Sequence, residues 1–174
     1  MDNMISGCCW NCGDDVTVYQ IIKEEHWTMQ EMDAAAMGNW VFEDLEPRAE
    51  GMQGGFKLLG FDIVIAGKNF GCGNKSVEHP MAALIGAGVR LVIAESFSRY
   101  NYRNAINLTL PVLTCPGIRQ FAHMGDRISA NLLSGEIINM TSNQTIQGDG
   151  LSEFALKIIA SGGLLEHIMA RAKR

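Results

Sequence analysis

The chain lacks both a long apolar run and a block of basic residues. No apolar stretch approaches the roughly 20 residues that a membrane-spanning helix needs. The formal charge is −5, and the few lysines and arginines are scattered, which gives no support for nucleic-acid binding. The N-terminus also lacks the charged and apolar regions of a signal peptide. We therefore expect a cytoplasmic chain that binds neither nucleic acid nor a membrane.

The five cysteines are too irregularly spaced for an iron–sulfur site of the ferredoxin type. In a reducing compartment they are expected to be thiols or metal ligands rather than disulfides. Cys9 and Cys12 form a CxxC pair, a pattern that binds zinc or performs redox chemistry in other proteins. Because a second pair is absent, we favour small buried thiols near the first strand and predict no metal site on this chain.

The 174 residues predict one domain, spanning 1–174, that buries roughly 70% of the surface of the unfolded chain. Its centre is the stretch 61–107. Ile63–Ala66 is short, apolar and rich in β-branched residues, which indicates a strand buried on both faces. A glycine-bearing loop follows, then a helical pattern over Pro80–Gly88 and a second buried strand over Leu91–Ala94. This βαβ order predicts an α/β fold with a mostly parallel sheet and flanking helices, and with ligands at the carboxyl ends of the strands.

The other expected elements flank this unit. They are a strand-like run over Val16–Ile22, a helix from a Thr28–Glu31 capping box to Met37, a helix over Ser96–Ala105, a strand over Pro111–Thr114, a hairpin of Glu136–Met140 and Gln144–Gln147, and two C-terminal helical segments divided at Gly162–Gly163. The hairpin supplies a small antiparallel segment. The C-terminal segments are expected to pack over a sheet face through Phe154, Ile158, Ile159, Leu164, Leu165, Ile168 and Met169.

Several polar residues follow the central strands. Asn69 and the amides of Gly71 and Gly73 are expected to contact a ligand, because glycine permits close backbone approach. Arg99 and Arg103 lie four residues apart and share one face of the predicted helix, where they bind a carboxylate, meet a partner's acidic surface, or remain solvated.

The motifs GKNFGCG, EH, AGVRLVIAESFSR and YRNAIN resemble the small subunit of 3-isopropylmalate dehydratase, the detached swivel domain of the aconitase superfamily. The resemblance extends from Gly7 to the final helix. It implies a swivelling β/β/α domain, active as a hydro-lyase only with a large subunit that carries a [4Fe–4S] cluster, and hence a hetero-oligomer. It also implies a malate-like di- or tricarboxylate as substrate.

The resembling loop departs from the family pattern G-K-N-F-G-C-G-S-S-R-E-H. Aligned on Glu78 and His79, the family's catalytic serine becomes Lys75, its second serine Ser76 and its carboxylate-binding arginine Val77. The resemblance then assigns Lys75 and Ser76 to catalysis; His79 joins them as a proton carrier or forms a structural pair with Glu78. In another alignment register, Asn74 corresponds to the family's catalytic serine. Asn74 is therefore a substrate-binding candidate in both registers.

A second difference lies where the family recognises the variable arm of its substrate. Glu25 and His26 occupy this segment, and Glu25 stands where the family often has an arginine. The reversed charge disfavours a carboxylate on that arm, unless the segment is simply a solvated turn. These changes favour a paralogue that acts on a different hydroxy acid. The alternative is a non-catalytic binding or regulatory protein that retains the swivel fold.

Overall fold

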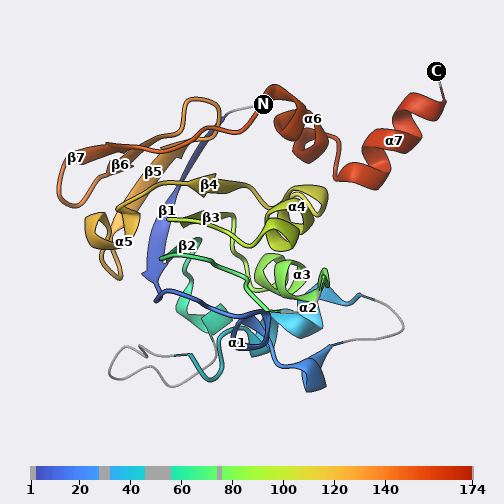
Figure 1. The fold of residues 1–174 in the computed structure, drawn as a ribbon, viewed down its shortest axis with the longest axis horizontal. Helices are drawn as coiled ribbons and strands as arrows, with labels where there is room; N and C mark the ends of the chain where they lie inside the picture. Colours follow the sequence, from blue (N-terminus) through green and yellow to red (C-terminus); the bar gives the residue numbers. More distant parts are fainter. Residues whose placement is uncertain (1–2, 28–31, 46–55, 74–75, 174) are drawn as a thin grey trace.

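A computed structural model describes residues 3–27, 32–45, 56–73 and 76–173. One seven-stranded sheet runs through the molecule in the order β4-β3-β2-β1-β5-β6-β7 (Figure 1). The strands are β1 (Met4–Asn11), β2 (Ile63–Ala66), β3 (Leu91–Ala94), β4 (Val112–Thr114), β5 (Arg127–Asn131), β6 (Glu136–Asn139) and β7 (Gln144–Gln147). Strands β1 to β4 are parallel, and β5 to β7 are antiparallel. The expected α/β class, with its small antiparallel segment, is confirmed.

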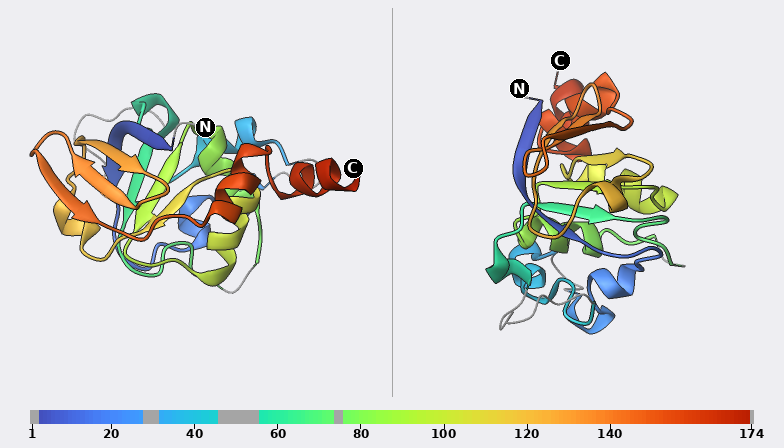
Figure 2. Two further views of the ribbon diagram at one scale, coloured as in Figure 1. Left: turned by 90° about the horizontal axis from the view of Figure 1, so that it is seen from above. Right: turned by 90° about the vertical axis from the view of Figure 1, so that its left-hand side faces the viewer.

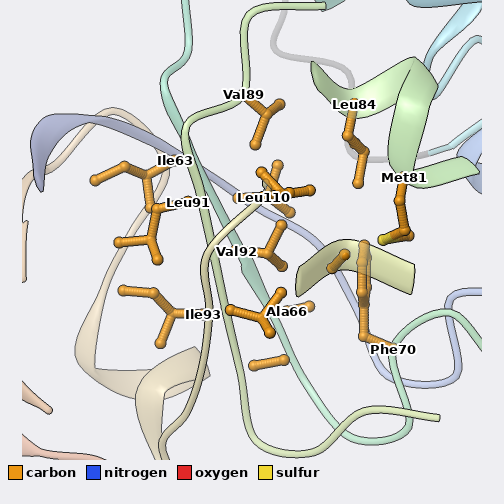
Figure 3. Close-up of a cluster of buried hydrophobic side chains, with 14 of the residues drawn as sticks. Ile63, Ala66, Phe70, Met81, Leu84, Val89, Leu91, Val92, Ile93 and Leu110 are labelled. Carbon is orange, nitrogen blue, oxygen red and sulfur yellow. The ribbon is translucent and has the colours of Figure 1, made fainter. Parts of the chain in front are cut away.

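Two apolar strands of four residues each lie within the parallel part of the sheet. β2 and β3 are fully buried and pair in register from Ile63↔Leu91 to Ala66↔Ala94. Successive side chains point to opposite faces. In Figure 3, Val92 points toward α3 (His79–Gly86), whereas Leu91 and Ile93 point to the other face. Both faces are therefore apolar, as a parallel sheet covered by helices requires.

Helices lie on both sides of the parallel strands. Helices α3 and α4 lie along one side and α5 on the other (Figure 1). Besides α3, the α-helices are α1 (Val18–Ile21), α2 (Ala34–Met37), α4 (Arg99–Asn107), α5 (Ile118–Phe121), α6 (Glu153–Ala160) and α7 (Leu164–Ala172); short 3₁₀ turns cover Glu24–His26, Gly38–Trp40 and Phe56–Leu59. Within the described residues, no helix is long and apolar enough to cross a membrane.

Helix α3 ends as its sequence predicts. Gly88 adopts φ +93°, and its amide donates to the Ile85 carbonyl while the Val89 amide donates to the Leu84 carbonyl. These two bonds form a Schellman motif, which satisfies the last carbonyls of the helix. The chain then enters β3 after a turn of only a few residues.

Two predictions about the N-terminal region are wrong. The strand-like run over Val16–Ile22 contains helix α1. Thr17 and Gln20 form a reciprocal capping box at its start, and Val18 and Ile21 are buried. The helix expected to reach Met37 begins only at Ala34, after the Asp33 carboxylate accepts a bond from the Ala36 amide. The proposed Thr28–Glu31 cap lies outside the described residues.

The C-terminal helices also differ from expectation. Ile158 and Ile159 of α6 are buried as predicted, but Phe154 is exposed. Helix α7 extends away from the rest of the molecule (Figure 2) and contains no buried residue. Its apolar stripe of Leu165, Ile168 and Met169 is exposed. The periodicity correctly predicted a helix, but a helical stripe does not specify which surface covers it.

Candidate active site

The loops that follow the parallel strands are joined to one another by side-chain hydrogen bonds. After β2, the Lys68 amide donates to Asp14 Oδ1 at 2.8 Å, and Asn69 Nδ2 donates to Asp15 Oδ1 at 2.9 Å. The Asn69 amide donates to Ser96 Oγ, beyond β3, at 2.8 Å. The loops that follow β1, β2 and β3 are therefore joined at the carboxyl ends of these strands. Both the backbone amide and the side-chain Nδ2 of Asn69 donate bonds within the protein, so fewer of its hydrogen-bonding groups are available to a ligand.

Gly71 is a buried packing point of this loop. Its φ of +74° favours glycine, and an added Cβ would lie 2.8 Å from the Cβ of Asn101. The Gly71 amide donates to the Val16 carbonyl at 2.8 Å, and its carbonyl accepts bonds from Ser98 Oγ and Asn101 Nδ2. The amide is therefore engaged within the protein, contrary to its expected role as a ligand contact. Gly73, with φ +133°, is exposed.

Beyond Gly73, Asn74 and Lys75 lie outside the described residues. Ser76 is exposed. Val77 packs against the hydrophobic core, and its carbonyl accepts a bond from Asn104 Nδ2 of α4 at 2.9 Å. The position that the resemblance assigns to a carboxylate-binding arginine thus holds an apolar side chain directed into the protein.

His79 begins helix α3 and is half-buried. Its imidazole stacks on the indole of Trp27, with ring centroids 5.1 Å apart and 13° between the planes. Its Nδ1 atom is buried and has no hydrogen-bond partner among the residues that the structure describes. The suggested structural pairing with Glu78 is therefore not made through this nitrogen.

His26 is held in a polar and aromatic setting. Its ring stacks on Trp40, with centroids 4.2 Å apart, and its Nε2 lies 3.3 Å from Glu43 Oε1. Glu25 Oε1 lies 3.7 Å from the same nitrogen. The ligand atoms of Glu25, His26 and Glu43 lie within 4.8 Å of one another. Lys23 Nζ already neutralises part of this charge, at 2.6 Å from a carboxylate oxygen of Glu43.

The structure brings two predicted segments together. Trp27 directly follows His26 in the chain and stacks on His79, so the 24–27 segment lies beside the start of α3. The sequence predicted site roles for Glu25, His26 and His79. It placed Trp27 in the same segment as Glu25 and His26 without giving it a role, and it gave no role to Trp40 or Glu43. Trp40 and Glu43 belong to the stretch WVFEDLEP at positions 40–47, which resembles the family's F-E-D-L-D-P connector. That resemblance is the sequence signal that marks them.

Arg99 and Arg103 form a separate feature. Both line a hollow of about 360 Å³ at the ends of β3 and β4, as their helical spacing predicts for residues on one face. Its other lining residues are Ser96, Phe97, Tyr102 and Thr114. Neither the 24–27 segment nor residues 76–79 contribute to this lining.

Three of the five cysteines, Cys9, Cys12 and Cys115, do not suit metal or cluster binding. Burial raises the pKa of Cys9 and of Cys12 to about 12, and their thiols donate to the carbonyls of His123 and Ile65. Cys115 is also buried, and its pKa is raised to about 11, mainly by burial. Metals and clusters bind thiolates, whereas the thiols of Cys9 and Cys12 donate to backbone carbonyls in this structure, so this pair fits neither group.

A parallel sheet extended by an antiparallel hairpin, with a glycine loop before α3, defines the swivel domain of aconitase-type hydro-lyases. The family described as the aconitase C-terminal domain matches residues 52–116. The crystal structure of a 3-isopropylmalate dehydratase from Methanocaldococcus jannaschii superposes with a TM-score of 0.81 and 29% identity, over 97% of this chain and 95% of that one.

Sequence comparison identifies the particular family. The chain is 37% identical to 3-isopropylmalate dehydratase small subunit 1 of Methanopyrus kandleri over 100% of this chain and 98% of that protein. It is 44% identical to the 2,3-dimethylmalate dehydratase small subunit of Eubacterium barkeri over 67% of this chain and 71% of that protein. The chain belongs to the family of 3-isopropylmalate dehydratase small subunits, and is a hydro-lyase small subunit.

Proposed function

We propose that this chain closes over a large subunit and completes a site that dehydrates and rehydrates a malate-type hydroxy acid in the cytoplasm. The observation that most supports this proposal is the stack of Trp27 on His79. Because of it, the segment that contains Glu25 and His26 lies beside the start of α3. A substrate that contacts one segment therefore also lies near the other. The relatives' names, which pair different substituted malates with one fold, support a substrate of this class.

The [4Fe–4S] cluster is assigned to the large subunit, because Cys9, Cys12 and Cys115 are buried and the cysteine spacing of this chain differs from that of a ferredoxin-type site. Dehydratases of this type remove a proton alpha to a carboxylate. On this chain, Lys75 and Ser76 are the proposed groups that accept it, and the exposure of Ser76 supports its contact with a second subunit. His79, with an unpartnered Nδ1, is the proposed group that passes the proton on.

The remaining polar groups are assigned to binding. Asn74 and the exposed Gly73 contact the substrate near the base, and Asn69 holds the loop in place. His26 and Glu25 face the variable arm. Because Glu25 is exposed and negatively charged, and because Val77 replaces the usual arginine, we expect an arm without a carboxylate.

The decisive experiment is reconstitution with a large subunit that carries three cluster cysteines, encoded beside this chain. Citramalate, isopropylmalate and 2,3-dimethylmalate are the probes, and the ultraviolet absorbance of the unsaturated product is the readout. Lys75→Ala and Ser76→Ala should each lower kcat by about 10²- to 10⁴-fold, while the mass of the complex stays unchanged. The matched controls are Lys157→Ala and Ser142→Ala, both at exposed sites far along the chain.

Each other outcome has a definite meaning. Full activity in both loop variants would remove Lys75 and Ser76 from the mechanism. A stable complex that turns over none of the probes would favour the non-catalytic binding protein. Absence of any complex would contradict the two-subunit proposal itself.

A further inference from the structure

Helix α4 presents different chemistry on its two sides. Asn101 and Asn104 hold the loop, through the carbonyls of Gly71 and Val77. Arg99 and Arg103 line the separate hollow of about 360 Å³. Residues 99 and 103 lie on one side of the helix, and 101 and 104 on another, because a helix turns about 100° per residue. The arginines are thus not part of the loop's own support.

Neither guanidinium group forms an ion pair with the part of the chain that the structure describes. No carboxylate of the described residues lies within 4.0 Å of Arg99 or Arg103, whereas Arg119 pairs with Asp14 at 3.3 Å. Both arginines are exposed, in a protein whose formal charge is −5. Two adjacent, unneutralised cations repel each other unless an anion lies between them.

The hollow also contains hydrogen-bond donors. Ser96 Oγ accepts a bond from the Asn69 amide, which leaves its own hydrogen available. The Ser98 hydroxyl donates to the Gly71 carbonyl and does not cap the first turn of α4, so the amides of that turn receive no bond from the N-cap side chain. Burial, and then the charge of Asp149, raises the pKa of Tyr102, so its phenol stays a donor.

We propose that this hollow is a binding site for a small di- or tricarboxylate, formed by Arg99 and Arg103 and separate from the loop at 74–79. Each guanidinium can bind one carboxylate through two parallel hydrogen bonds. A volume of about 360 Å³ is at the small end of ligand sites, which span roughly 300–1,000 Å³. It suits an organic acid of a few carbons better than a nucleotide.

The nearby carboxylate of Asp149 sets a condition on the ligand. Asp149 is joined to Thr114, a lining residue, by a backbone bond of 2.7 Å, and its charge acts on Tyr102. It opposes any anion in the hollow. A monocarboxylate gains from one guanidinium only, whereas a polycarboxylate engages both, so the site selects for multiple charges.

The test uses isothermal titration of the full chain with citrate and malate, and with acetate as the monocarboxylate. The two polycarboxylates should bind at least tenfold more tightly than acetate. Arg99→Gln/Arg103→Gln should weaken citrate binding at least tenfold, and Arg99→Lys/Arg103→Lys should recover only part of it, because lysine cannot bind bidentately. Arg127→Gln, which removes an exposed arginine from β5, is the matched control. Asp149→Asn should strengthen binding.

Undetectable citrate binding, or equal affinity in the double glutamine variant and the wild type, overturns the proposal. So does a double variant that binds citrate normally but no longer assembles with the large subunit, since the arginines would then serve acidic side chains of that partner. Circular dichroism checks that each variant is folded. The titration needs no large subunit and no turnover, so its failure is distinct from a failure of the proposed dehydratase function.

Discussion

The imidazole of His79 lies nearly parallel to the indole of Trp27, with 5.1 Å between ring centroids. Tyr19 also stacks on Trp27, with ring centroids 6.1 Å apart and 9° between the planes. Trp27 itself is buried and donates its indole N–H to the Ile22 carbonyl at 3.3 Å. The position of His79 is therefore set by an aromatic stack, and within the described residues its buried Nδ1 has no hydrogen-bond partner.

This arrangement separates a structural role of His79 from a chemical one. His79→Phe keeps the stack, which is worth about 0.5–1.5 kcal/mol, and removes a buried unpaired nitrogen whose cost is about 1–3 kcal/mol. We expect the variant to be at least as stable as the wild type in urea unfolding, yet at least 100-fold slower in the reconstituted complex. Normal turnover by His79→Phe would show that the ring alone matters.

Helices α2 and α3 approach each other closely at glycines. A Cβ on Gly86 would overlap the carbonyl oxygen of Ala34, and one on Gly38 would overlap the backbone of Gly86. Gly86→Ala should therefore destabilise the protein by about 1–3 kcal/mol, although alanine favours a helix by about 1 kcal/mol. Gly13→Ala, with no atom within 4 Å of the added carbon, is the control and should be near neutral. Equal unfolding midpoints for the two variants would contradict this packing.

The elements that the sequence predicted best are those whose burial is complete. Strands β2 and β3 are uninterrupted apolar runs, and every residue in them is buried. Helix α3 has its stop signal at Gly88. In these places local pattern and tertiary environment agree, which is the condition for reading structure from sequence.

Prediction failed where the outcome depends on distant partners. The 16–22 run has a pattern compatible with a strand, but the seven strands of the sheet do not include it. It forms helix α1 instead, with Val18 and Ile21 buried. The apolar stripe of α7 correctly predicted a helix, but it did not predict that the side chains of the stripe are exposed. Likewise, the Trp27–His79 contact joins residues 52 positions apart, and no local pattern specifies such a pair.

Thiol reactivity follows the burial of the cysteines. Cys9 and Cys12, with pKa values raised to about 12 by burial, hold little thiolate at pH 8, and the thiolate is the nucleophile. Cys72 is partly exposed, but burial and then the charge of Asp15 raise its pKa. With iodoacetamide and mass spectrometry, we expect Cys8 to be alkylated first, Cys72 next, and Cys9 and Cys12 only on unfolding. Rapid labelling of Cys9 or Cys12, or retention of zinc by the purified chain, would restore a redox or metal role for the CxxC pair.

Asp126 lies in the turn directly before β5 and makes the stability of the protein depend on pH. Partial burial by itself raises the pKa of Asp126, but the bonds donated by the His123 amide at 2.9 Å and by Asn139 Nδ2 at 2.7 Å outweigh it and lower the pKa below 3.8. Because the folded pKa is lower than the unfolded one, this carboxylate stabilises the fold fully above the unfolded pKa. The contribution is lost as the pH falls through the folded pKa.

Asp126→Asn tests this relationship. The amide cannot accept both bonds as a charged group, so we expect a loss of about 1.5–3 kcal/mol at pH 7. The difference from the wild type should shrink as the pH drops below about 4, because protonation then removes the same charge from the wild-type protein. Glu136→Gln, at an exposed position on β6, should show no such convergence. Urea unfolding at closely spaced pH values measures both curves, and a gap that persists at pH 2 would mean that the side chain acts through packing and not through its charge.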